Sequence, residues 1–346
     1  MTSLSVPQTG TSAPVRRAQP RRGRLTAAAA IFLLVAGGGL SLVSGSVNVA
    51  WSDVVRALVE QSDTVAANIV WNLRLPRMLL AGLVGASLAV SGVVLQGVMR
   101  NPLASPDVIG VTAGAALAAT IVLLATTGLP GYLPVCAFGG ALLSALLVYA
   151  ISWQPGQGTS AIRMVLAGVA VGLMLGAVTN FLMVVFSDRV QSVVLWMTGS
   201  LQDASWGKLN LILPYVLGGL LASVILVRPL DTLQLGEEAA ASLGIHVERS
   251  RMLAAATAAM LAGAAICVTG LVGFVGLMVP HLMRLLVGHR HAVLLPLAAL
   301  GGAVLMVWAD LAARTVLAPT ELPVGILTAL LGGPYFVFLL YRRKLT

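Results

Sequence analysis

Charged residues are scarce in this sequence: only 10% of its 346 residues are Asp, Glu, Lys or Arg, whereas 58% are hydrophobic. A soluble domain carries about 25% charged residues, and a soluble core this large would lack the polar residues needed to cover it. The scarcity of charge therefore excludes an ordinary soluble protein. No long polar stretch interrupts the chain after residue 24, so we expect one all-α membrane domain over residues 25–343. Residues 1–24, rich in Ser, Thr, Pro, Gln and Arg, are expected to form a disordered cytoplasmic tail.

Lysine is almost absent, and this bears on catalysis. The two lysines, Lys208 and Lys344, are each followed by Leu, so the chain has no Gly-x4-Gly-Lys-Ser/Thr loop to hold nucleotide phosphates. The Gly-x-Ser-x-Gly nucleophile elbow is also missing from the sequence. We therefore expect no enzymatic activity and no bound cofactor on this chain. If ATP drives the protein, ATP and Mg²⁺ must be bound by a separate ATPase subunit.

Cysteine and histidine are also rare, which argues against a metal site. Cys136 and Cys267 lie inside apolar runs and are expected to be small buried hydrophobic residues. No Cys-x-x-Cys or His-Glu-x-x-His pattern is present. The four histidines fall at the predicted cytoplasmic ends of helices, where wet interfacial positions explain them.

What the sequence has in abundance is apolar runs of about 20 residues, the signature of transmembrane helices. Ten spans are predicted, with ends uncertain by a few residues: 25–43, 78–99, 108–126, 132–151, 164–186, 209–227, 252–269, 272–287, 292–316 and 324–341. The eighth is short and broken by Gly and Pro. Residues 191–201 are apolar but too short to cross a bilayer, which favours a re-entrant or interfacial helix.

Basic residues indicate the orientation of the spans. With the N-terminus inside, the predicted cytoplasmic segments hold fifteen Lys and Arg residues and the outer segments hold six. This excess predicts a multi-pass protein of the cytoplasmic (inner) membrane with both termini cytoplasmic, and an even number of spans agrees. The pI near 10.5 then reflects topology, and no nucleic-acid partner is expected, because no basic patch alternates with aromatic residues on a soluble module.

The N-terminus allows a second interpretation. Arg21, Arg22 and Arg24 precede an apolar run, as in a cleaved signal peptide. The run is long for the apolar region of a signal peptide and nine more spans follow, so an uncleaved first helix is favoured.

Small residues recur every three or four positions in two predicted spans and so share one helix face. In the fifth span the set is Gly168, Gly172, Gly176 and Asn180, and in the second it is Gly85, Ala89, Gly92 and Gln96. Small residues allow close helix packing in lipid, whereas a polar intramembrane residue such as Asn180 or Gln96 can also line a translocation path. Both interpretations, path lining and helix packing, stay open for these residues.

Intramembrane charge is limited to one acidic residue well inside a long span. Asp310 has Arg314 four residues further on, within reach of an ion pair. A single carboxylate with a ready partner near the end of a span favours a structural pair over an ion-coupling site.

The longest polar segment after residue 73 is 229–251, predicted to be cytoplasmic. Gly236 can start a short helix, and Glu237 and Glu238 suit the positive end of its dipole. Ala239, Ala240 and Ala241 continue the helix, and Gly244 is placed to end it in the left-handed conformation. Such a helix is a candidate docking element for a soluble partner, although an ordered loop without a partner is the alternative.

Several stretches in order along residues 70–343 give the chain a specific resemblance. They are Arg74-Leu-Pro-Arg77, Gly85 to Gln96, Arg100-Asn-Pro-Leu-Ala104 with Pro106 and Gly110, Trp196-Met-Thr-Gly-Ser-Leu201, Leu235-Gly-Glu237 to Leu243-Gly244, Gly270-Leu-Val-Gly-Phe-Val-Gly-Leu-Met-Val-Pro-His281 with Arg284, Ala309-Asp310 with Arg314, and Glu321-Leu-Pro-Val-Gly325 with Gly332 and Pro334. With these residues the chain resembles the permease subunits of iron–siderophore and vitamin B12 ABC importers (FecCD-type), a type II importer architecture with ten spans. The N-terminal tail lies outside the resemblance.

The resemblance implies partners and residue roles. The partners would be two ATP-binding subunits, a second permease that is identical or paralogous, and an extracytoplasmic substrate-binding protein. Arg74, Arg77 and Arg314 would meet acidic residues of that binding protein. The coupling residues that receive the ATPase stroke would be Leu235, Gly236, Glu237, Glu238, Ala239, Ala240 and Gly244. The fifth span, from Gly168 to Asn180, would border the translocation path.

The function implied is import of a ferric siderophore or related iron chelate, with cobalamin and haem as alternatives. An ion-coupled secondary transporter is a less favoured hypothesis, because neither midplane carboxylates nor inverted repeats are evident. A membrane scaffold without transport activity is the third.

Overall fold

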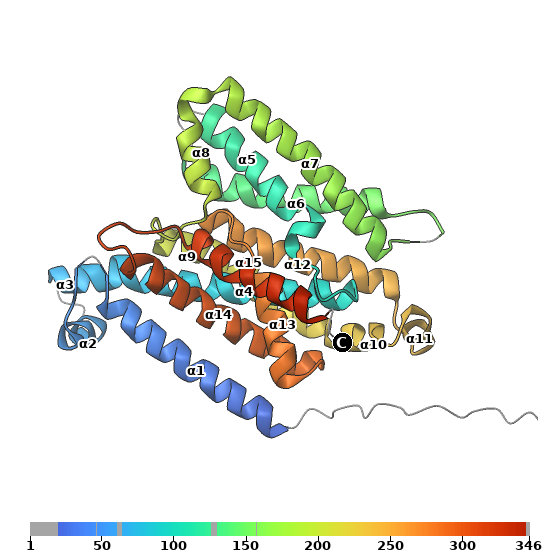
Figure 1. Cartoon of the computed structure of the whole chain (residues 1–346), viewed down its shortest axis with the longest axis horizontal. Helices are drawn as coiled ribbons and strands as arrows, with labels where there is room; N and C mark the ends of the chain where they lie inside the picture. The colour runs from blue at the N-terminus through green and yellow to red at the C-terminus, as the bar shows by residue number, and fades with distance from the viewer. Residues whose placement is uncertain (1–19, 46, 61–63, 126–129, 157, 344–346) are drawn as a thin grey trace, which may run out of the picture.

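The computed structural model describes residues 20–45, 47–60, 64–125, 130–156 and 158–343. Over these residues the chain is helical, with one isolated bridge between Gln154 and Gly158, so the all-α prediction is confirmed (Figure 1). The α-helices are α1 (Pro20–Val43), α2 (Trp51–Glu60), α3 (Val65–Asn68), α4 (Leu75–Val98), α5 (Val111–Ala125), α6 (Leu133–Ser152), α7 (Ala161–Val185), α8 (Val190–Met197), α9 (Trp206–Ile225), α10 (Val227–Leu233), α11 (Glu237–Ser242), α12 (Val247–Thr269), α13 (Val275–Val287), α14 (His291–Thr315) and α15 (Val324–Arg343). Short turns complete the set: the π-helical η1 (Ile69–Arg74) and the 3₁₀ turns η2 (Pro106–Ile109), η3 (Pro130–Tyr132) and η4 (Ser187–Arg189).

The ten predicted spans correspond one to one with helices of the structure. In the described part of the chain, seven helical segments are long and apolar enough to cross a membrane: α1, the continuous run from α3 to α4, α6, α7, α9, α12 and α14. Three shorter apolar helices, α5, α13 and α15, supply the rest. The first helix begins at Pro20, so residues 20–24 of the predicted tail are helical, whereas residues 1–19 lie outside the described residues.

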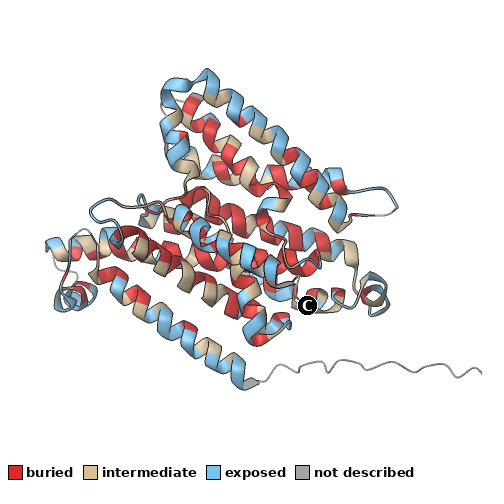
Figure 2. Ribbon diagram, viewed as in Figure 1, coloured by how far each residue is buried: buried red, intermediate tan, exposed pale blue. Residues whose placement is uncertain are grey.

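Two helices form the centre of the bundle. In the most apolar window of the α3–α4 run 72% of residues are buried, and in that of α12 78%, against 28% in α1 and 22% in α7. Figure 2 shows this contrast as red central ribbons and pale outer ones. The reason lies in side-chain size, because α12 is rich in Ala and α4 carries Gly and Ala at the positions where other helices cross it.

The small-residue stripe of α4 is a packing surface. A Cβ on Gly85 would lie 2.1 Å from the carbonyl oxygen of Gly302 in α14, and one on Gly92 would lie 1.8 Å from that of Gly276 in α13. Only glycine allows backbones to approach so closely. For Gly85 and Gly92 the structure therefore places the stripe in helix–helix contact inside the chain.

The bundle has two distinct ends, visible at the left and right of Figure 1. At one end, here called the α2 end, lie α2 and α3. At the other, the α11 end, lie α10, α11, the start of α1 and the C-terminal part of α15, so the two termini of the described helical domain share one end, as an even number of spans requires. The short helix expected within residues 191–201 is α8, whereas α2, α3 and α10 were not predicted.

Three stretches that carry the family resemblance meet where the chain is not helical. Residues 270–273 form a non-helical connection into α13. Gly270 begins it with φ +73°, and Phe274, with φ +65°, follows it directly before α13. Ser200 donates its backbone N–H to the carbonyl oxygen of Thr269 at 2.7 Å, and Gly325 donates to Gly199 at 3.0 Å. These contacts join the stretches around residues 199, 270 and 325 into one backbone junction, which explains why α13 starts later than predicted.

Candidate functional site

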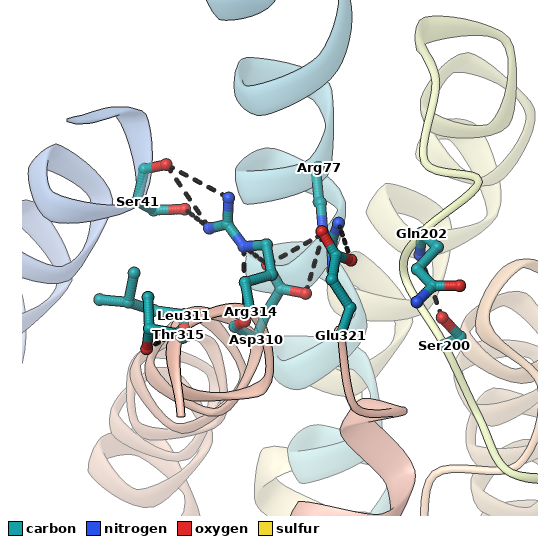
Figure 3. Close-up of polar contacts among 9 residues, drawn as sticks. All are labelled: Ser41, Arg77, Ser200, Gln202, Asp310, Leu311, Arg314, Thr315 and Glu321. Atoms are coloured by element: carbon teal, nitrogen blue, oxygen red, sulfur yellow. Dashed lines mark hydrogen bonds and ion pairs between the residues drawn. The ribbon is translucent and has the colours of Figure 1, made fainter. Parts of the chain in front are cut away.

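An ion-pair cluster occupies the α2 end of the bundle (Figure 3). The carboxylate of Asp310, 1% exposed, accepts from Arg77 Nε at 3.0 Å and pairs with Arg314 Nε at 3.2 Å. Arg77 also donates through Nη1 to Glu321 at 2.9 Å. The predicted pair of Asp310 with Arg314 is confirmed, and it is half of a four-residue cluster that binds α4, α14 and the segment before α15 together.

Arg74 and Arg314 are anchored on the backbone beside this cluster. Arg74 donates to the carbonyl oxygens of Leu42 at 2.6 Å and Val43 at 2.7 Å, and also to Val47. Arg314 donates through Nη2 to the hydroxyl of Ser41 at 2.5 Å. The end of α1 therefore presents acceptors to two guanidinium groups, which is how two buried positive charges are accommodated there.

The three arginines predicted to meet a binding protein line one cavity of about 460 Å³. Glu321 and Gln202 contribute to its wall. The four-residue cluster has two positive and two negative side chains, so the neighbouring Arg74 leaves one net positive charge at this cavity. Their side chains are turned inward and paired within the chain, which the sequence pattern did not indicate.

Sequence reasoning missed the role of Glu321. It lies 244 positions from Arg77 and pairs with it, and Arg77 lies 233 positions from Asp310. Local spacing shows pairs within one helix, such as Asp310 with Arg314, but gives no signal for a pair that forms only when α4 and α14 pack.

The second candidate site is the polar segment at the α11 end. Helix α11 runs from Glu237 to Ser242, with Gly236 before it at φ +111° and Gly244 after it at φ +80°. The predicted start, acidic first turn and left-handed termination are confirmed. Ala240 is fully buried against the bundle, whereas Leu235 is 67% and Leu243 57% exposed. Two large apolar side chains thus flank a short anchored helix without covering from the described part of the chain.

A chain of polar contacts connects α11 to the loop between α6 and α7. Glu237 forms an ion pair with Arg251 of α12, and Arg251 donates to the carbonyl oxygen of Thr159 at 2.6 Å. Glu248 of α12 accepts from the backbone N–H of Thr159 at 2.9 Å and from the hydroxyl of Tyr149 at 2.6 Å. Thr159 lies two residues before α7, so α11, α12 and the start of α7 are held by one network. Arg251 and Glu248 were not predicted, because their partners are distant in sequence.

The third candidate is the small-residue stripe on α7, whose members have different surroundings in the structure. Gly168 packs inside the chain: a Cβ there would lie 1.7 Å from the carbonyl oxygen of Val108. At Gly172 and Gly176 an added Cβ meets no atom within 4 Å, and Asn180 is exposed. Three of the four residues therefore face away from the described part of the chain.

Gln96, the polar member of the α4 stripe, is buried at 3% exposure. Its amide Nε2 lies 3.4 Å from the carbonyl oxygen of Gly276, and its Oε1 accepts from Arg284 of α13. This residue therefore joins α4 to α13, and it also borders a cavity at the α11 end.

Comparison with known proteins adds to these observations. The model of the FecCD transport family matches residues 33–342. The chain is 43% identical to the hemin transport system permease protein HmuU of Yersinia pestis, over 88% of this chain and 92% of that protein. It is 44% identical to the cobalamin import system permease protein BtuC of Halobacterium salinarum, over 80% and 74% respectively. It is 40% identical to the Fe(3+) dicitrate transport system permease protein FecD of Escherichia coli K12, over 91% and 98%.

A solved structure has the same fold. It is described as an inward-facing conformation of a metal-chelate type ABC transporter, and it aligns with a TM-score of 0.78 at 33% identity. The alignment covers 92% of this chain and 99% of that chain.

Proposed function

This chain belongs to the FecCD transport family, and we propose that it imports a ferric siderophore or a related iron chelate. It is a multi-pass permease subunit of an ABC importer, as its relatives are. Two of the three relatives described above are named for iron-containing cargoes, hemin and ferric dicitrate, which supports an iron chelate. Haem itself and cobalamin are the alternatives within the same family.

The observation that carries the importer mechanism is the form of α11. A helix of six residues is held on the bundle through Ala240 and through the Glu237–Arg251 pair, yet Leu235 and Leu243 remain exposed. Exposed apolar side chains at the end of a membrane bundle are suited to a partner surface. We infer that two separate ATP-binding subunits, which hold ATP and Mg²⁺, dock on this segment in the complete importer and that the α11 end faces the cytoplasm.

The polar network would transmit a movement of α11 to α7, which borders the proposed translocation path. Glu237, Arg251 and Thr159 form a continuous series from α11 to the residue pair before α7. An ATP-driven shift of α11 would therefore bias the start of α7. The open face of α7, with Gly172, Gly176 and Asn180, would lie against a second permease, identical or paralogous, and border the central path. Asp310, the acidic residue inside a span, is fully engaged in ion pairs, so this carboxylate gives an ion-coupled mechanism no support.

Leu243→Asp is the variant that tests this function. We expect it to remove most of the co-purifying ATP-binding subunit and to reduce uptake of the iron chelate at least about tenfold, since a buried charge at the centre of an interface costs several kcal/mol. The measurement is a mild-detergent pull-down of the tagged chain from its host, with uptake assayed in the same cells. Val59→Asp is the matched control, because Val59 is 77% exposed at the opposite end.

The proposed function would be contradicted if the wild-type chain purified without an ATP-binding subunit under conditions that keep other ABC importers intact. Equal loss of the subunit in the Val59→Asp variant would contradict the docking site while leaving the importer class intact.

The cavity at the α2 end is proposed to receive an extracytoplasmic binding protein, with Arg74, Arg77 and Arg314 as the attracting charges. Glu321 competes for Arg77 within the chain. Glu321→Gln should therefore raise the affinity for the binding protein about threefold to tenfold, as expected for one charge change at a partly exposed pair. Surface plasmon resonance on the reconstituted permease measures this.

Glu60→Gln provides the control for that experiment. Glu60 also lies at the α2 end and pairs with Arg56 at 3.9 Å, but both side chains are more than 60% exposed and outside the cavity. If the affinity rises equally in both variants, the cause is the overall charge of the α2 end and not the cavity. An unchanged affinity in Glu321→Gln would contradict docking of the binding protein through Arg77.

A further inference from the structure

A second cavity, of about 420 Å³, lies at the α11 end among α4, α13 and the connection from α10 to α11. Its wall includes Gln96, Arg100, His281, Arg284, His289 and His291. No carboxylate lines it among the described residues. The volume exceeds what one ordered water needs and is within the range of small-ligand sites.

Arg284 is the unusual member of this wall. Its recorded partner in the described part of the chain is the amide oxygen of Gln96, a neutral acceptor. A guanidinium group removed from bulk water is costly unless an anion or several acceptors compensate it. Arg284 is half-buried and faces the cavity, so the protein itself compensates its charge less than it does that of the more deeply buried arginines.

Among the described residues, the arginines whose side chains are more deeply buried show what full compensation by the protein is. Arg77 and Arg314 share the carboxylate of Asp310, and Arg251 has that of Glu237. Arg74 has no carboxylate but donates to three backbone carbonyl oxygens. The contrast points to a missing anion beside Arg284, and not to a general tolerance of unpaired charge.

The remaining wall is suited to an anion. Arg100 is exposed at the end of α4, in a left-handed conformation at φ +50°. His291 is fully buried, and its Nδ1 lies 2.7 Å from Asp231. Its Nε2 is buried without a hydrogen-bond partner and lies against Gly97 in the cavity wall. Because Nδ1–H donates to Asp231, Nε2 of the neutral ring is an acceptor in the same cavity wall as the two arginines, and a hydroxyl group of a bound ligand can satisfy it.

Several residues of this wall also take no part in the two docking sites described above. Gln96, Arg100, Pro102, His281 and Arg284 all belong to the stretches that carry the family resemblance, yet neither the docking cavity at the α2 end nor the α11 segment uses them. The fold brings four separate stretches, residues 96–102, 234, 281–285 and 289–291, to one cavity.

We propose that this cavity is a binding site for a phosphate-class oxyanion, held by Arg284 and Arg100 with His291 at its inner wall. Guanidinium groups match the geometry of phosphate oxygens. Two sources supply such a group at the end of a membrane bundle: the headgroup of an anionic phospholipid, or a soluble phosphate. The inference does not rest on the identity of the transported cargo.

The test uses the full chain in phosphatidylcholine nanodiscs, with its thermal midpoint measured in about 10 mM inorganic phosphate and in chloride of equal ionic strength. A ligand that binds only the folded state raises the midpoint, and we expect a rise of about 3 °C. In the lipid arm, the chain is extracted from vesicles of phosphatidylcholine and phosphatidylglycerol, and native mass spectrometry counts retained phosphatidylglycerol.

Arg284→Gln and Arg100→Gln should each abolish the phosphate response or the lipid retention, whichever the wild type shows. Arg228→Gln is the matched control, because Arg228 is exposed in α10 at the same end and outside the cavity. Phosphate stabilisation identifies a soluble ligand, and retained phosphatidylglycerol identifies a lipid headgroup. If Arg284→Gln does not fold, Arg100→Gln alone decides the question.

Two outcomes overturn the proposal. One is a wild type that shows neither response. The other is an Arg100→Gln variant that responds like Arg228→Gln.

Discussion

Gly92→Ala should prevent this chain from reaching its folded state in the membrane. The added Cβ would lie 1.8 Å from the carbonyl oxygen of Gly276 and 2.9 Å from its Cα, and both are backbone atoms that cannot rotate away. Helices α4 and α13 would have to separate along a face where Gln96 and Arg284 also meet. Overpacking of this kind costs about 3 kcal/mol or more. The measurement is the folded fraction after detergent extraction, by size-exclusion chromatography, together with the thermal midpoint.

Gly172→Ala is the matched control, since it makes the same chemical change on α7 where an added Cβ meets nothing within 4 Å. We expect no loss of folded protein there, because Ala favours helix over Gly by up to about 1 kcal/mol. A larger change, Gly172→Leu, should leave the chain folded but reduce uptake, since the proposed second permease lies against this face.

Two results would contradict these expectations. Normal folding of Gly92→Ala would mean that α4 and α13 are not in contact as described. Normal uptake by Gly172→Leu would remove the open face of α7 from the proposed path and permease interface.

Asp310→Asn is expected to destabilise the chain by about 3–5 kcal/mol, as is usual when one partner of a buried ion pair is removed. Asp310 is 1% exposed and serves both Arg77 and Arg314. Without its charge, the described residues leave Arg314 with Ser41 and backbone oxygens as partners and leave Arg77 with Glu321. The thermal midpoint should fall by about 6 °C or more, and less folded protein should survive extraction.

Glu321→Gln removes one carboxylate from the same cluster and serves as the control for this variant. The side chain of Glu321 is 25% exposed, so water compensates part of the loss, and a fall in midpoint well below that of Asp310→Asn is expected. Equal midpoints for Asp310→Asn and the wild type would show that this cluster does not stabilise the packing of α4 against α14.

Much of the fold could be predicted because the signals for it are local. Apolar run length predicts a helix that must satisfy its own backbone hydrogen bonds in lipid, and each of the ten runs is a helix in the structure. The α11 helix was predicted for the same reason, because Gly236, the glutamates after it and Gly244 act within one turn of the chain. The extra length before α4 was not predicted, since η1 contains Asn72 and Arg74 and so lacks an apolar signature.

Residue roles were less predictable. The pattern Gly168 to Asn180 is one stripe in sequence, yet Gly168 packs on Val108 while Gly172 and Gly176 face open space. Helix periodicity places residues on one face but does not say where along that face a neighbour crosses. The family resemblance implied that Arg74, Arg77 and Arg314 meet acidic residues of a binding protein, and nothing in the sequence indicated that their side chains also contact acceptors from α1, α14 and the segment before α15.

By itself, the sequence determined that this chain is an all-helical membrane protein with ten apolar spans, no nucleotide loop and a capped polar helix between the sixth and seventh spans. It did so because bilayer thickness, helix capping and charge are read within a few neighbouring residues. Only the tertiary structure decided that Arg77 shares Asp310 with Arg314, that Arg251 links α11 to the start of α7, and that Arg284 faces a cavity lined by no carboxylate from the described residues. Those contacts join residues many positions apart, and they exist only once the helices have packed.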